Sequence, residues 1–264
     1  MPPYHQYSRL YSHLPVSWNA WPGAGESEKT SAEDVRYQEI LGDKSYMMGV
    51  SPWFYTNLPQ WDKNWYFASD TLWFDRWQQA LEVLPDSIQI ISWNDFGESH
   101  YIGDTVPAQI VEGANKYVDG FDHSALRAVL PYFISAYKAG TGAIPPPSDE
   151  AIAWYRTTPA KAGPDGGTIW GQSGSLSASD ATEDVVNVLT ITVDETDIEV
   201  IIGGESHSFR TGGGASPASF FQVPYGGLGE VTLNMNGRSV VGPAITGDVP
   251  GTGHVNFNAL AIAL

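Results

Sequence analysis

The segment Gly140-Thr-Gly-Ala-Ile-Pro-Pro-Pro147 separates two parts of this 264-residue chain that have different hydrophobic patterns. Three successive prolines cannot continue a helix, and they stiffen the connection that they form. At about 150 residues per domain, a chain of this length can hold one large domain or two ordinary ones. We therefore expect a domain boundary here, with a first domain over residues 1–143 and a second over residues 144–264.

Strand-like and helix-like segments alternate in the first part. Apolar residues at helical spacing, together with capping and stop signals, predict helices over residues 31–41, 72–84 and 126–137. Short apolar runs predict strands over residues 14–19, 46–50 and 88–93. Three β–loop–α units in succession favour parallel strands joined by crossover helices, and so an α/β fold.

The second part is rich in Gly, Ser, Thr and Val after residue 160. Its β-rich runs lie over residues 185–193, 198–202, 220–223, 230–233 and 255–264. Glycine clusters separate several of these runs, as tight turns between short strands require. This spacing predicts a small antiparallel β-sandwich.

The three strands predicted in the first part end alike. Each apolar run leads into Ser and then into Trp18, Trp53 or Trp93, once with a Pro between. In a parallel α/β barrel the carboxyl ends of the strands meet at one rim, where active sites are built. The three tryptophans therefore predict an aromatic floor at a site. Core packing is the alternative for each of them, because a Trp buries a large surface wherever it lies.

Two acids follow the third of these strands: Asp95 is the first acid after it, and Glu98 follows three residues later. Apolar surroundings and a like-charged neighbour both raise the pKa of a carboxyl group, so one of the pair is expected to hold a proton while the other stays ionised. Such asymmetry suits the hydrolysis of glycosidic bonds. The alternative is a helix N-cap with an acid in its first turn, which has the same spacing. The position at a strand end, beside a Trp-rich rim, favours the catalytic interpretation.

Composition and motifs exclude several other functions. The chain has 30 Asp and Glu against 13 Lys and Arg, a net charge of −17, which disfavours binding to nucleic acid or to an anionic membrane surface. It has no Cys, and its six His show no zinc-ligand spacing. No glycine-rich segment forms a phosphate loop or a dinucleotide fingerprint. We therefore expect neither a metal nor a cofactor.

Four long motifs in the first part are specific enough to compare with a known family. They are Val16-Ser-Trp-Asn-Ala-Trp-Pro22, the segment Gly42–Pro59, Asp75-Arg-Trp-Gln-Gln79 and the segment Gln89–Gly103. Together they resemble glycoside hydrolase family 71, the fungal endo-1,3-alpha-glucanases or mutanases. The resemblance covers about residues 14–157 and continues more loosely through the β-rich tail.

The resemblance implies a (β/α)8 barrel followed by a β-sandwich, and endo-hydrolysis of α-1,3-linked glucan by an inverting mechanism. The Asp-x-x-Glu pair of the family's catalytic set matches Asp95 and Glu98. Inversion needs an acid and a base about 6.5–9.5 Å apart, and two carboxyl groups three residues apart are expected to lie closer, so another acid is expected from a different strand. The aromatic side chains expected to line sugar subsites are Trp18, Trp53, Tyr55 and Trp93. The polar side chains expected to bind sugar hydroxyls are Asn94, His100 and Tyr101.

The first part is too short for a whole barrel, because a (β/α)8 barrel typically needs about 250 residues. We therefore expect the fold to be the C-terminal part of such a barrel followed by the sandwich, without the early strands and the early-strand Asp of the family. Family members are secreted, so we expect an extracellular monomer, although no signal peptide or membrane span is visible in the sequence. One alternative function is a truncated remnant that binds α-glucan without cleaving it. Another is that residues 150–264 are only a structural sandwich packed on the barrel.

Overall fold

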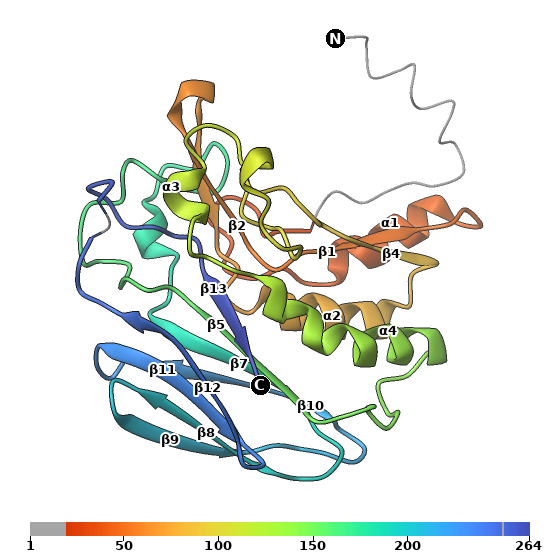
Figure 1. Cartoon of the computed structure of the whole chain (residues 1–264). Coiled ribbons are helices and arrows are strands. Elements are labelled where there is room, and N and C mark those ends of the chain that lie inside the picture. Colours follow the sequence, from red (N-terminus) through yellow and green to blue (C-terminus); the bar gives the residue numbers. More distant parts are fainter. Residues whose placement is uncertain (1–19, 250) are drawn as a thin grey trace.

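The computed structural model describes residues 20–249 and 251–264, in which strands hold more residues than helices (Figure 1). The helices are α1 (Ala32–Leu41), α2 (Leu72–Val83), α3 (Asn115–Val118) and α4 (Leu130–Ala139), with the 3-10 turns η2 (Pro59–Trp61), η3 (Pro107–Gln109), η4 (Ser124–Val129) and η5 (Ala178–Asp180). The strands are β1 (Met47–Val50), β2 (Phe54–Leu58), β3 (Lys63–Phe67), β4 (Ser87–Ile90), β5 (Glu150–Tyr155), β6 (Ile169–Trp170), β7 (Val185–Ile191), β8 (Asp197–Ile202), β9 (Glu205–Arg210), β10 (Ala218–Pro224), β11 (Gly229–Met235), β12 (Arg238–Ile245) and β13 (Leu260–Ala263). None of the described helices is long and apolar enough to cross a bilayer.

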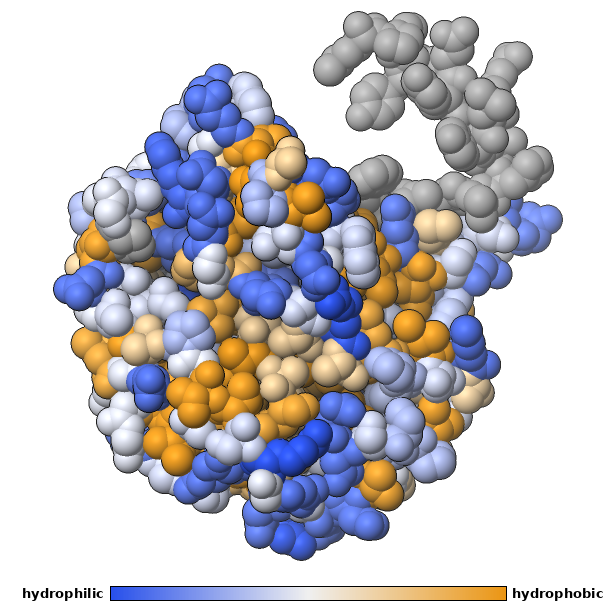
Figure 2. Space-filling model, in the orientation of Figure 1, coloured by the Kyte–Doolittle hydropathy of each residue, from blue (hydrophilic) through white to orange (hydrophobic). Residues whose placement is uncertain are grey.

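Two four-stranded antiparallel sheets face each other in the second part of the chain. Their strand orders are β10-β7-β5-β13 and β12-β11-β8-β9. In β8 the side chains of Ile198, Val200 and Ile202 are buried, while the residues between them are more exposed. This period of two is that of a strand with one face on a core, here the core between the two sheets. Figure 2 shows hydrophilic residues gathered at the lower end of the molecule, where turns between the sandwich strands lie.

Strand β5 is buried on both faces, which makes its sheet the central layer of the molecule. Ala151, Ala153 and Tyr155 belong to the core shared with the second sheet. Ile152 and Trp154 point the other way, into a second core that includes residues of α2 and α4. This second core, called the helical core below, joins side chains from both sides of Gly140–Pro147. The domain boundary at residue 143 stays a prediction.

Strands β1 and β4 form a parallel pair, with Met47 opposite Ser87 and Val50 opposite Ile90. Helix α2 precedes β4 in the chain, and its residues share the helical core with those of β1. The segment between β1 and α2 is an antiparallel hairpin of β2 and β3, which extends as a sheet by a short parallel pairing of β3 with β6. The loop after β4 leads to the candidate site.

The expected barrel fold is wrong. Within residues 20–249 and 251–264 no closed barrel forms, β1 and β4 pair only with each other, and most of the other pairings are antiparallel. A barrel requires every strand to have a partner on each side. The residues after β1 build a hairpin that belongs to another sheet, so the parallel pair gains no third strand. The predicted strand over residues 14–19 lies outside the described residues.

Candidate active site

The loop after β4 is closed by backbone hydrogen bonds near its base. The N–H of Ser92 donates to the carbonyl of His100 at 2.8 Å, and the N–H of Ile102 donates back to Ser92 at 3.0 Å. The N–H of Gly103 donates to the carbonyl of Trp93 at 2.8 Å. A Cβ on Gly103 would lie 2.5 Å from that carbonyl, so only glycine fits this close approach. The closed base presents the residues between 93 and 100 as a compact tip.

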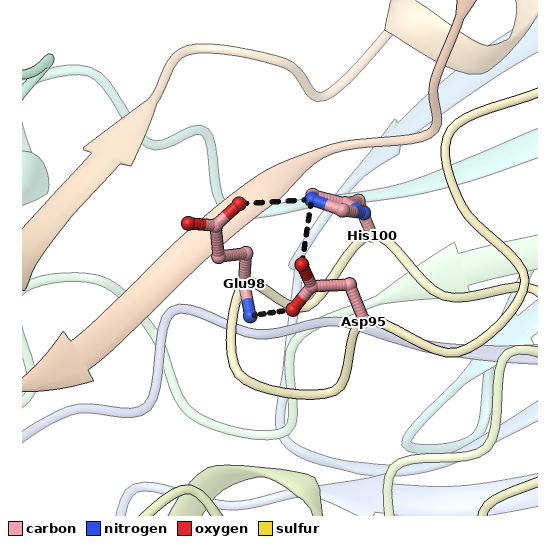
Figure 3. Close-up of side chains that lie close together, drawn as sticks. All are labelled: Asp95, Glu98 and His100. Atoms are coloured by element: carbon pink, nitrogen blue, oxygen red, sulfur yellow. Dashed lines mark hydrogen bonds and ion pairs between the residues drawn. The ribbon is translucent and has the colours of Figure 1, made fainter. Parts of the chain in front are cut away.

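Three side chains converge at this tip: Asp95, Glu98 and His100 (Figure 3). His100 Nε2 lies 3.2 Å from Glu98 Oε2 and 3.9 Å from Asp95 Oδ2. Asp95 Oδ1 accepts the backbone N–H of Glu98 at 3.1 Å. His100 is buried, whereas the side chains of Glu98 and Asp95 are 25% and 45% exposed. Both acids are therefore open to a ligand while the imidazole behind them is enclosed.

Ser92 connects the base of the loop to this cluster. Its Oγ accepts the backbone N–H of Asp95 at 2.9 Å and lies 2.9 Å from His100 Nδ1. Because Glu98 can only accept, the hydrogen between Glu98 and His100 sits on Nε2. The Ser92 hydroxyl lies against Nδ1, so both ring nitrogens of His100 have a polar partner.

Lys63, the first residue of β3, reaches Glu98 from the hairpin. Its Nζ donates to Glu98 Oε1 at 2.9 Å. Burial by itself raises the pKa of Glu98, but the hydrogen bonds from His100 and Lys63 and the charges of those groups outweigh it and lower the pKa to about 2. Glu98 therefore stays ionised at neutral pH.

Two hollows meet at Glu98 and Lys63, which line both of them. The first, called the Asp95 hollow, measures about 280 Å³ and also has Trp61 and Asn94 in its wall. The second, called the Trp21 hollow, measures about 530 Å³ and has Trp21 in its wall, together with Phe54, Trp65 and Phe67 of the hairpin. The ionised carboxylate thus lies between a mixed hollow and an aromatic one.

The structure places the predicted sugar-binding residues in different environments. Trp53, Tyr55 and Tyr101 are buried in the core and line neither hollow. Trp93 is 61% exposed, but it lines neither hollow and packs under the Arg127 guanidinium, 5.4 Å from its ring centroid. Asn94 lines the Asp95 hollow, and His100 lies behind the acids. Trp18 lies outside the described residues.

Sequence reasoning missed the hairpin residues of the site, Lys63 and Trp65, and the two further tryptophans Trp21 and Trp61. The run Lys63-Asn-Trp-Tyr-Phe67 is aromatic enough to indicate a strand. Its turn, however, contains no glycine. The left-handed position that a hairpin turn often gives to Gly is taken by Asp62, with φ of 57°.

One atom from each of Asp95, Glu98 and His100 lies within 4.8 Å of the other two, close enough for a shared cation. The imidazole and carboxylate are already hydrogen-bonded to each other, and Lys63 supplies a positive charge at the other Glu98 oxygen. We describe the three residues as a hydrogen-bonded network. The expectation that the site uses no metal stays a prediction.

Comparison with known proteins finds one matching family model and three similar named proteins. The family model described as glycosyl hydrolase family 71 matches residues 14–264. The chain is 37% identical over 211 residues to a glucan endo-1,3-alpha-glucosidase of Schizosaccharomyces pombe, a match that covers 79% of this chain and 47% of that protein. It is 38% identical over 170 residues to a mutanase of Penicillium rubens, covering 62% of this chain and 38% of that protein. It is 40% identical over 149 residues to an ascus wall endo-1,3-alpha-glucanase of Schizosaccharomyces pombe, covering 52% and 34%. The chain therefore spans less than half the length of these relatives, and no solved structure matches it significantly.

Proposed function

Because the chain belongs to glycosyl hydrolase family 71, we propose that it acts in the hydrolysis of α-1,3-glucosidic bonds of a glucan. The matched relatives are named as α-1,3-glucanases or as a mutanase, which supports this substrate class. We place the reaction at the tip of the β4 loop. An extracellular location accords with a polysaccharide substrate, which is too large to enter a cell.

The observation that carries the proposal is the ionised carboxylate of Glu98 at the junction of two hollows. A glucan laid across this junction would have sugar units on both sides of Glu98. An ionised carboxylate can take a proton from water as the water oxygen attacks the anomeric carbon. The glycosidic oxygen must then receive a proton from an acid as its bond to that carbon breaks.

That acid is not Glu98, since its pKa of about 2 leaves it without a proton at neutral pH. The partner atoms of Asp95 and Glu98 lie within 4.8 Å of each other, closer than the roughly 6.5–9.5 Å that separates acid and base in inverting enzymes. We therefore propose that Asp95 works on the same side of the glucan as Glu98, around the attacking water. The proton donor would come from another part of the enzyme.

Aromatic walls suit the rest of the substrate. Trp61 is 53% exposed at the Asp95 hollow, and Trp21 lies in the wall of the other hollow. Indole rings offer flat apolar faces on which the C–H faces of a sugar ring can pack. These two tryptophans replace the buried Trp53 and Tyr55 in the proposed substrate contacts.

The test compares Glu98→Gln and Asp95→Asn with Glu112→Gln, an exposed acid outside both hollows. Reducing ends released from insoluble α-1,3-glucan are measured beside a pull-down on the same polymer. We expect each site variant to lose at least a hundredfold in turnover, typical of a lost general base, and the control to keep the parent rate. Equal rates in all variants would remove both acids from the mechanism. Binding without release by the parent chain would favour a non-catalytic glucan-binding remnant.

A further inference from the structure

We propose that Lys63 and His100 are positioning residues that hold the Glu98 carboxylate from two sides, and that Lys63 makes the hairpin β2–β3 part of the active site. The inference deepens the proposed function and rests on it for its catalytic meaning. The contacts that carry it are present without substrate.

Each oxygen of Glu98 has its own donor. Lys63 Nζ lies 2.9 Å from Oε1, and His100 Nε2 lies 3.2 Å from Oε2. A carboxylate bound at one oxygen can still rotate about its last torsion angle, whereas two donors on different oxygens fix its plane. The two donors come from different elements, β3 and the β4 loop, so the orientation depends on how those elements are joined.

The hairpin and the loop are also joined through the backbone of the same residue. The N–H of Tyr55 in β2 donates to the carbonyl of Glu98 at 3.1 Å. Tyr55 and Lys63 lie on paired strands, and Leu58 is the register partner of Lys63. The hairpin therefore bonds to both the backbone and the side chain of Glu98. The backbone bond fixes the distance from which Lys63 contacts the carboxylate.

His100 is held in the form that donates to Glu98. Its Nδ1 faces the Ser92 hydroxyl at 2.9 Å, and that hydroxyl also accepts the N–H of Asp95. The rings of Trp21 and Phe54 pack on the imidazole, with centroids 5.1 and 5.7 Å away. These contacts keep the ring from turning its Nε2 away from the carboxylate.

The charges around Glu98 come from a small set of groups. Lys63 and His100 face its oxygens, and Asp95 Oδ2 lies 3.9 Å from His100 Nε2. The Tyr117 hydroxyl, which donates to the carbonyl of Gly97, is a further titratable neighbour. Removing Lys63 takes away the positive charge that contacts Glu98 Oε1 and leaves Asp95 close to Glu98. Protonation of Glu98 then becomes easier, and its side chain is free to turn.

The experiment follows the Glu98 carboxyl carbon by NMR in the full chain labelled at Glu, with the signal assigned from its loss in Glu98→Gln. Titration from pH 7 downward compares the parent with Lys63→Met, Lys63→Arg and Lys161→Met, a control that removes an exposed lysine paired with Asp180. We expect Lys63→Met to raise the titration midpoint of Glu98 by about 1 pH unit or more, as for the loss of an adjacent opposite charge. Lys63→Arg and the control should keep the parent midpoint. A parent midpoint retained in Lys63→Met would overturn the proposal.

Because the titration uses no substrate, its outcome is independent of whether the chain hydrolyses glucan. Where the parent chain releases reducing ends, Lys63→Met should also lower kcat at least tenfold and move the acid limb of the pH profile upward, with Lys63→Arg restoring both. An unmoved acid limb in an active Lys63→Met variant would remove the positioning role and leave the proposed hydrolysis standing.

Discussion

At the scale of single residues, Arg76 and Asp34 show how a buried charge pair ties elements together. Arg76 Nη1 donates to Asp34 Oδ2 at 2.8 Å, and both side chains are almost fully buried. The guanidinium also donates to the carbonyl of Gly49 in β1, while the Tyr46 hydroxyl donates to Asp34. One arginine thus joins α1, α2 and β1.

Replacing Arg76 by Met should destabilise the chain by about 3–5 kcal/mol, because it leaves the Asp34 carboxylate buried without its partner. Arg127→Met is the matched control, since Arg127 pairs with Asp104 at the surface, where the side chains are 32% and 78% exposed. Arg127→Met should lower the free energy of unfolding by about 1 kcal/mol or less. Urea unfolding followed by circular dichroism measures both. Similar losses in the two variants would contradict the argument.

A second buried group, His123, makes stability depend on pH. Its ring lies against the Tyr101 ring at a centroid distance of 3.8 Å, and its nitrogens face the carbonyls of Tyr101 and Ala259. Burial lowers the pKa of His123 to about 4, although those carbonyls act in the opposite direction. The unfolded chain therefore takes up more protons at this residue than the folded chain between about pH 6.5 and pH 4.

The contribution of neutral His123 to the free energy of unfolding is complete above pH 6.5 and is lost as the pH falls toward 4. Unfolding free energies at pH 7 and pH 4.5 should differ by about 2 kcal/mol through this residue. His123→Asn should reduce the pH dependence of the free energy of unfolding by that amount. An unaltered pH dependence in His123→Asn would rule out the residue as its source.

Some site residues were predictable from sequence and others were not. The spacing of Asp95 and Glu98 after an apolar run was enough to predict that they lie together. The burial of Trp53 was not predictable, because a Trp at the end of a strand can face the core as easily as a cleft. Lys63 was missed because its contact with Glu98 is made across 35 residues of chain.

At the scale of elements, the hydrophobic period predicted the long helices and several of the later strands. Helix α2 begins at Leu72 and ends at Val83, close to the predicted bounds of 72–84. The hairpin β2–β3 was missed because most residues of β2 are buried, so its sequence lacks the alternation that marks a strand with one exposed face. The sequence-based interpretation therefore lacked Lys63 and Trp65, two hairpin residues that line the site.

Strand β5 offers a test of the layered packing. Ile152 in β5 is fully buried in the helical core, whereas Ile201 in β8 points away from the sandwich core and is half-buried. Ile152→Ala should lower the free energy of unfolding by about 2–5 kcal/mol. Ile201→Ala should lower it clearly less, because only the first substitution leaves an enclosed cavity. Equal losses in urea unfolding would mean that the outer sheet is covered as fully as the central one.

At the scale of the whole molecule, local pattern could not predict how many strands join one sheet. Alternating strands and helices are typical of parallel sheets, and β1 and β4 are indeed parallel. What the pattern does not contain is the pairing of β3 with β6, more than 100 residues away in the chain. That long-range pairing takes the hairpin out of the parallel sheet.

The shared helical core predicts how the chain unfolds. Trp154 and Leu189 of the central sheet belong to the same buried cluster as Trp77 of α2 and Phe133 of α4. We expect one calorimetric transition, with equal calorimetric and van't Hoff enthalpies. Two separate transitions would instead support independent domains on either side of residue 143.

Burial of β5 on both faces also limits which substitutions this strand can accept during evolution. After its first residue, Glu150, every residue of β5 is buried, so a polar replacement at any of them is costly. Strand β9, at the edge of the other sheet, is half-buried only at His207 and Phe209, so it tolerates change at its other positions. In distantly related sequences, we therefore expect β5 to have changed less than β9.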